Sequence, residues 1–285
     1  MPMTSASKRL LFGTAGIPQS TSTTSTLAGI KQITQLKLDC LEIEFVRGVR
    51  MGNDTGQKIR EAAKTYNISL SAHAPYYVNL NSNERGKRLA SQERLLTSAR
   101  MANKCGAKSL VFHPGYYGSY GPEETHKTIK EGLKEIVSIL RSERNPVILR
   151  PETMGKRSQY GSLNEILILC REVDGMLPCV DFSHIHAREG KVNSYIEFSR
   201  VLKKIEKKLG EEAIRNMHIH ISGVEYNSKG ELKHLNLKDS DFRFENWIHA
   251  LNDIGAEGMV ICESPNLEQD AKMLKVLYWS HVYKT

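Results

Sequence analysis

Histidines and carboxylates end six successive apolar segments of the chain. Each segment has the length of a β-strand. The histidines and carboxylates at their ends are His73, His113, Glu152, Asp181, His220 and Glu263. One histidine at a strand end is usually only hydrogen-bonded, but six such residues in succession are hard to explain as a structural accident. Converging carboxylates raise one another's pKa unless cations lie among them. Because imidazole and carboxylate together suit Zn²⁺, with Mn²⁺ or Fe²⁺ as substitutes, the pattern predicts a divalent metal centre.

Two further histidines extend this set. His184 follows Asp181 by three residues, and His234 belongs to segment 224–241, which we expect to form a long loop or a small hairpin. These candidate ligands are too many for one ion, so two or three ions are expected, with Glu152 between them. Two ions roughly 3.5–4 Å apart suit phosphodiester hydrolysis, because they make hydroxide near neutral pH and stabilise the attacking and leaving oxygens.

Eight apolar segments alternate with longer segments of helical period. The expected strands are residues 10–13, 40–45, 69–73, 109–113, 147–152, 177–181, 217–221 and 259–263. The expected helices are residues 27–36, 56–66, 84–105, 123–141, 163–173, 195–209, 242–253 and 267–279. Eight such units favour an α/β fold with a single (β/α)8 TIM barrel, and an open doubly wound sheet is the alternative. In the seventh strand His218 and His220 face the same side, with His218 one layer deeper.

The composition fits one folded domain. The chain has 285 residues, of which 40% are hydrophobic, enough for a substantial core. Residues 9–285 are expected to form the barrel domain and residues 1–8 a flexible tail. No apolar run approaches the roughly 20 residues that span a bilayer, and no signal-peptide pattern is present, so we expect a cytoplasmic protein without membrane association. The five cysteines form no CxxC pair and are expected to be buried thiols.

Five motifs carry a resemblance to a known family. They are Ser71-Ala-His73-Ala-Pro-Tyr76-Tyr77-Val-Asn79, Phe112-His113-Pro114-Gly115, Pro151-Glu152-Thr153, Asp181-Phe-Ser-His184 and Cys262-Glu263-Ser-Pro265. In this order the chain resembles the endonuclease IV family over nearly its whole length. Members of that family are TIM-barrel endonucleases that cut DNA at abasic sites with a trinuclear, usually zinc, centre. Related sugar-isomerase barrels share parts of the same motifs.

The resemblance implies a particular set of ligands. His73, His113 and Glu152 would hold one ion, and Glu152, Asp181, His220 and Glu263 would hold the second. A third ion would take His184, His234 and a carboxylate. The family has an aspartate two residues before the loop histidine, where this chain has Leu232. Glu231 is the candidate substitute, so the third site is open at this stage.

The resemblance also implies a surface for DNA. Tyr76 and Tyr77 match positions that enter the minor groove at the lesion, where an aromatic wedge stabilises a kinked duplex; ordinary packing at the barrel rim is the alternative. Arg47 and Arg50, together with Lys156 and Arg157, are candidates to contact phosphates. The excess of 40 basic over 32 acidic residues, a net charge of +8, favours an anionic partner.

The function expected from these residues is metal-dependent DNA repair. A monomer would bind double-stranded DNA that contains an abasic site and cut the phosphodiester on its 5′ side, leaving a 3′-hydroxyl and a 5′-deoxyribose phosphate. Glu152 and Glu263 are the expected catalytic carboxylates: Glu152 orders the cluster and both orient the nucleophile. A sugar isomerase or epimerase with one or two ions is the alternative enzyme, and a barrel that binds abasic DNA without cutting it is a third reading.

Overall fold

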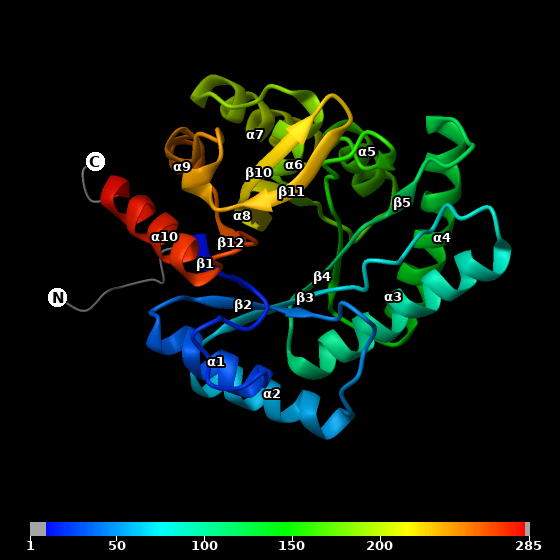
Figure 1. Ribbon diagram of the computed structural model, residues 1–285. Helices are drawn as coiled ribbons and strands as arrows, with labels where there is room; N and C mark the ends of the chain where they lie inside the picture. Colours follow the sequence, from blue (N-terminus) through cyan, green and yellow to red (C-terminus); the bar gives the residue numbers. More distant parts are fainter. Residues whose placement is uncertain (1–9, 283–285) are drawn as a thin grey trace.

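Eight parallel strands form the centre of the protein and helices surround them (Figure 1). The computed structural model describes residues 10–282, so the expected tail at residues 1–8 lies outside the described residues. The barrel strands are β1 (Leu10–Ala15), β2 (Cys40–Glu44), β3 (Ser69–His73), β4 (Ser109–Phe112), β6 (Ile148–Pro151), β8 (Cys179–Asp181), β9 (Met217–Ile221) and β12 (Gly258–Cys262). Each coincides with one of the eight expected strands to within a few residues.

The order of the strands closes the sheet into a barrel. Strand β1 pairs with both β2 and β12, and the remaining strands follow in parallel on either side until β6 and β8 are reached. A bridge between Glu152 and Cys179 joins β6 to β8, and the Thr153 amide donates to the Cys179 carbonyl over 3.1 Å. Closure leaves no long unpaired edge. The expected single (β/α)8 barrel is therefore confirmed, and the open doubly wound sheet is excluded.

Ten α-helices are found among the described residues, and most of them cover the outside of the barrel. They are α1 (Thr26–Gln35), α2 (Asn53–Thr65), α3 (Arg85–Cys105), α4 (Pro122–Ser142), α5 (Leu163–Glu172), α6 (Phe182–Glu189), α7 (Tyr195–Leu209), α8 (Glu211–Arg215), α9 (Phe244–Asp253) and α10 (Glu268–Val282). Helix α6, in contrast, is almost fully buried beside residues 223–235. In α4 the buried residues Ile129, Leu133, Ile136 and Leu140 recur every three or four positions, as one helix face requires. None of the described helices is long and apolar enough to cross a membrane.

Helices α6 and α8 are additions to the expected pattern. Helix α6 begins directly after β8, where the sequence suggested only a turn. The Asp181 side chain caps it by accepting a hydrogen bond from the His184 amide over 2.7 Å. This cap places His184 in the first helical turn, beside the end of its strand.

The segment after β9 contains the anticipated small hairpin. Strands β10 (Gly223–Asn227) and β11 (Gly230–Leu235) pair antiparallel and lie beside α6, drawn in yellow in Figure 1. The short turn η1 (Leu237–Asp239) follows. Two-residue strands β5 (Gly115–Tyr116) and β7 (Gln159–Tyr160) also pair, which links the loops after β4 and β6.

A buried arginine joins the amino-terminal ends of several strands. The Arg150 guanidinium donates to Ser109 Oγ over 2.7 Å, to the Pro178 carbonyl over 3.1 Å and to Asn216 Oδ1 over 2.8 Å. Burial lowers the pKa of Arg150 to about 10. The five cysteines are buried and free, as expected.

Candidate metal centre

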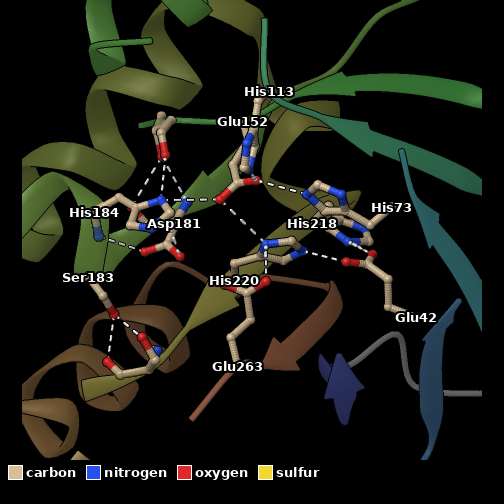
Figure 2. A network of polar contacts seen from close by, with 12 residues as sticks. Glu42, His73, His113, Glu152, Asp181, Ser183, His184, His218, His220 and Glu263 are labelled. Carbon is tan, nitrogen blue, oxygen red and sulfur yellow. Dashed lines mark hydrogen bonds and ion pairs between the residues drawn. The ribbon is translucent and has the colours of Figure 1, made fainter. Parts of the chain in front are cut away.

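The expected ligand residues come together at the carboxyl ends of the barrel strands, and most of them are labelled in Figure 2. A cavity of about 450 Å³ is lined by His73, His113, Glu152, His184, His234 and Glu263, while Asp181 and His220 are fully buried in one group with Glu152 and Glu263. Among the described residues, ligand-type atoms within 4.8 Å of one another form four groups. One of them, Cys179, His218 and His220, is fully buried, and the other three include the residues at the strand ends. These three groups are His73, His113 and Glu152; Glu152, Asp181, His220 and Glu263; and His184, Glu231 and His234. Glu152, from the end of β6, belongs to two of them and contacts the third.

The first group is arranged around one oxygen of Glu152. The Nε2 atoms of His73 and His113 lie 3.3 and 3.2 Å from Glu152 Oε2. His73 donates its Nδ1 hydrogen to the Ala74 carbonyl over 2.7 Å, which leaves Nε2 facing the carboxylate. Burial disfavours a charged imidazole, but Glu152 and Glu44 outweigh it and raise the pKa of His73 to about 9. The group therefore attracts positive charge.

The second group is buried more deeply and is acidic. Nδ1 of His220 lies 3.3 Å from Glu263 Oε1 and 3.5 Å from Glu152 Oε1. Burial, opposed by His184 and supported by the charges of Glu263 and Glu152, raises the pKa of Asp181 to about 6. The neighbouring carboxylates thus favour the protonated form of Asp181, and a bound cation would favour its ionised form instead.

The buried atoms of this group fit a metal ion. Glu152 Oε1, Asp181 Oδ2 and His220 Nδ1 are inaccessible to solvent, and none has a hydrogen-bond partner. Buried polar atoms without partners are rare, and each is costly. Their lone pairs converge instead of pairing with donors, so a divalent cation bound by oxygen and nitrogen would satisfy them together.

The third group uses Glu231 as its carboxylate. Nε2 of His184 lies 3.4 Å from Glu231 Oε2, and Nε2 of His234 lies 3.7 Å from Glu231 Oε1. Each histidine donates its Nδ1 hydrogen to a backbone carbonyl, that of Thr153 over 2.9 Å and that of Glu263 over 3.3 Å. Both free nitrogens are therefore directed at the same carboxylate.

A bulge in strand β11 explains why Glu231 takes the place expected for residue 232. Glu225 pairs with Lys233 but Tyr226 pairs with Glu231, so Leu232 is an extra residue in β11. In a regular strand residues 232 and 234 would share a face. The extra residue exchanges the faces, and Glu231 joins His234 while Leu232 is 51% exposed. The bulge therefore places Glu231 in one group with His184 and His234.

Two adjacent tyrosines are exposed, and the first of them, Tyr76, lines the cavity. Tyr76 and Tyr77 are 53% and 51% exposed, which is more than core packing would leave. The Tyr76 ring lies 6.1 Å from the rings of both His73 and His113. The Tyr77 ring packs beneath the Arg94 guanidinium at 4.7 Å.

The four basic residues expected to contact phosphates lie in three different places. Arg47 and Arg50 line a second cavity of about 420 Å³ after β2, and Lys156 lines the cavity that holds the candidate ligands. Arg157 instead donates to the Arg188 carbonyl at the end of α6 over 3.1 Å, so its side chain is bound to the protein. Glu44 lines both cavities, which are therefore neighbours.

Glu42 and Glu44 are site residues that the sequence analysis missed. They occupy alternating positions of β2, so both side chains point to the barrel interior. Glu42 contacts His218 and His220, and burial raises the pKa of Glu44 to about 8. Two glutamates at alternating positions of an otherwise apolar strand are the signal that could have revealed them.

Imidazole and carboxylate groups at the carboxyl ends of eight parallel strands define an enzyme-like TIM barrel. Comparison with known proteins gives the same class. The chain belongs to the xylose isomerase-like TIM barrel family, whose model matches residues 30–277.

Relatives with similar sequences include endonucleases. An uncharacterized protein of Methanocaldococcus jannaschii is 46% identical over 270 residues, which cover 94% of this chain and 97% of the relative. A probable endonuclease 4 of Staphylococcus carnosus is 27% identical over 220 residues, covering 74% of this chain and 72% of the relative. The resemblance to the endonuclease IV family found in the motifs is thereby confirmed.

Solved structures share the fold. Endonuclease IV from Thermus thermophilus superposes with a TM-score of 0.75 at 18% identity, covering 97% of this chain and 100% of that one. A D-tagatose 3-epimerase-like protein superposes with a TM-score of 0.73 at 20% identity, covering 96% and 97%. At such identities the likeness establishes the barrel alone.

Proposed function

We propose that the protein is a metal-dependent endonuclease that cuts DNA on the 5′ side of an abasic site and leaves a 3′-hydroxyl and a 5′-deoxyribose phosphate. The observation that carries this proposal is the third group, His184, Glu231 and His234, next to the two groups that share Glu152. A site for three ions suits phosphodiester cleavage, in which charge develops on several oxygens at once. The endonucleases among the relatives support the same activity.

The ligand sets follow from the three groups. His73, His113 and Glu152 would hold one ion; Glu152, Asp181, His220 and Glu263 a second; and His184, Glu231 and His234 a third. Zn²⁺ is the ion we propose, with Mn²⁺ or Fe²⁺ as substitutes, because the ligands are imidazole and carboxylate without thiolate. Bound ions of this kind lower the pKa of water and stabilise negative charge on phosphate oxygens.

The protein's own residues position the reacting groups. Glu152 is 1% exposed and fixed by contacts with three histidines, His73, His113 and His184, so it orders the centre. Glu263 is half-buried at the cavity wall, where its carboxylate can accept a hydrogen bond from the attacking water and align it. We therefore assign the catalytic carboxylates as Glu152 and Glu263.

The rim of the cavity would receive the duplex. Tyr76 and Tyr77 are exposed beside the metal groups, where aromatic rings could fill the space left by the missing base. Arg47, Arg50 and Lys156 are candidates to contact the flanking phosphates, and the net charge of +8 favours approach of DNA. A single chain contributes every residue of this surface, so we propose that the enzyme acts as a monomer.

An incision assay tests the proposal. The substrate is a labelled duplex with one tetrahydrofuran abasic analogue, incubated with the protein after reconstitution with Zn²⁺ or Mn²⁺. We expect one nick 5′ to the analogue and none in the intact duplex. His184→Ala should slow the nick more than about 100-fold, whereas His249→Ala, on the exposed face of α9, should not. Binding of the abasic duplex without any metal-dependent nick would support the non-cutting barrel instead.

A sugar epimerase is the second candidate function. Glu152 and Glu263 form one group with Asp181 and His220, a set that can hold one ion beside two carboxylates able to move protons. The likeness to a D-tagatose 3-epimerase-like protein is consistent with this reading. An epimerase would exchange a carbon-bound hydrogen of a keto sugar with deuterium from solvent, bind one or two ions, and show no salt-sensitive affinity for DNA.

A further inference from the structure

Three histidines of the proposed metal centre are oriented by hydrogen bonds to the main chain. In each of them Nδ1 donates its hydrogen to a backbone carbonyl, which fixes the ring and leaves Nε2 as the free nitrogen. The contacts are His73 to Ala74 (2.7 Å), His184 to Thr153 (2.9 Å) and His234 to Glu263 (3.3 Å). At His73 and His234 the main chain thus leaves Nε2 facing a carboxylate. At His184 Nε2 faces Glu231, and Nδ1 also lies 3.1 Å from Glu152 Oε1.

His220 is oriented in the opposite way. Its Nδ1 faces Glu152 and Glu263, while its Nε2 lies 2.8 Å from Oε1 of Glu42 (Figure 2). The two atoms lie within hydrogen-bond distance, although their alignment in this structure is not that of a hydrogen bond. A side-chain carboxylate thus occupies the position that a backbone carbonyl occupies at the other three rings.

Glu42 is itself held in place. Its Oε2 accepts hydrogen bonds from Ser71 Oγ over 2.7 Å and from His218 Nε2 over 2.9 Å. All four side chains of this network are at most 1% exposed. His218 is the donor in its contact, because an ionised carboxylate can only accept a hydrogen bond. With Oε2 occupied in this way, Oε1 is the oxygen available to His220.

The contact between Glu42 and His220 affects which nitrogen of His220 can bind a metal ion. A neutral imidazole carries one hydrogen, and a carboxylate can only accept it. An ionised Glu42 therefore favours the form of His220 with hydrogen on Nε2 and a lone pair on Nδ1. Carboxylates behind ligating histidines also raise ligand basicity. Glu42 belongs to none of the ligand groups found among the described residues, so it acts through the ring.

We propose that Glu42 is a positioning residue for the metal centre, which directs Nδ1 of His220 at Glu152, Asp181 and Glu263 and so strengthens binding of the ion held there. The proposal rests on the metal centre of the proposed function. It adds a residue of β2 to a site otherwise built from later strands, with Ser71 and His218 as its supports.

Metal affinities measured without DNA test this role. Zn²⁺ is titrated against a chromophoric chelator, and Co²⁺ absorption reports the ligands of each ion. Glu42→Gln keeps the shape of the side chain but removes its charge. We expect one ion to bind 10–100-fold more weakly and the other ions to keep their affinities. Ser71→Ala is the matched control, because it removes one contact to Glu42 and leaves the His220 contact; its effect should stay within about threefold.

A double-mutant cycle separates positioning from a general structural effect. Against His220→Ala, the Glu42→Gln substitution should cause no further loss of affinity. Equal losses in both backgrounds, or wild-type affinity in Glu42→Gln, would overturn the proposal. If Glu42→Gln fails to fold by thermal unfolding, Glu42→Asp, which keeps the charge and shortens the reach, should still weaken the same ion. A wild-type protein that binds no ion at all would instead refute the metal centre of the proposed function.

Discussion

Gly155 lies close to two side chains of the third group, Glu231 and His184. A Cβ atom at this position would lie 2.7 Å from both Cβ and Oε2 of Glu231 and 3.0 Å from Cδ2 of His184. Rotation of the Glu231 side chain could relieve the contact with its oxygen. The contact between the two Cβ atoms can be relieved only by moving the backbone of β11. The Glu231 amide donates to the Gly155 carbonyl over 3.2 Å, so the two segments are bound to each other at this point.

The size of the displacement decides the outcome of Gly155→Ala. Ordinary van der Waals contact begins near 3.4 Å, so Glu231 must move by about 0.7 Å. A metal ligand tolerates only about ±0.2 Å around its bond length. We therefore expect the ion of the third group to bind at least 10–100-fold more weakly, while the groups around Glu152 keep their ions.

Metal content and affinity check this expectation. Elemental analysis after dialysis against buffered Zn²⁺ gives ions per chain, and chelator competition gives the affinity of each. Gly86→Ala, whose added methyl group meets no atom within 4 Å, is the matched control and should bind as the wild type does. A folded Gly155→Ala protein that keeps three ions with unchanged affinities would refute the reasoning about Glu231.

Three further predictions concern single side chains. Glu231→Ala should remove one ion per chain in elemental analysis, whereas Leu232→Ala, on the outer face of the bulge, should remove none; the reverse result would contradict the register of β11. Arg150→Met should lower the free energy of unfolding, measured in urea, by about 2–5 kcal/mol, because three buried acceptors lose their donor. A change below about 0.5 kcal/mol would show that these acceptors find other partners. Tyr76→Ala should weaken binding of an abasic duplex by roughly tenfold in fluorescence anisotropy and leave the metal content unchanged. An unchanged affinity would show that the Tyr76 ring does not contribute to DNA binding.

Most of the barrel and of its ligand set is encoded locally. Each strand is a short apolar segment, and its last residues reach the same end of the barrel whatever the neighbouring strand is. The end residues His73, Asp181 and Glu263 could therefore be identified without knowing any contact between them. The exact strand boundaries are less predictable: His113, Glu152 and Glu263 lie one residue beyond β4, β6 and β12.

Contacts between distant segments could not be derived in this way. Helix α6 forms because Asp181 accepts from the His184 amide at the start of a short segment, a geometry that competes with an ordinary turn. Arg157 carries the charge expected of a phosphate contact, yet a carbonyl of α6 binds it. The cap of α6 is a local contact with more than one possible geometry, whereas the partner of Arg157 lies 31 residues away in the chain.

The sequence by itself thus determined the eight-strand barrel and the identity of most candidate ligands, because strand period and strand ends are local properties. Only the tertiary structure decided that Glu231 joins His184 and His234, since the pairing of β10 with β11 places the bulge at Leu232. It also decided that Glu42 lies against His220, because closure of the barrel brings together strands that are 178 residues apart in the chain. A side chain's type is fixed by the sequence, but its partner depends on register and closure.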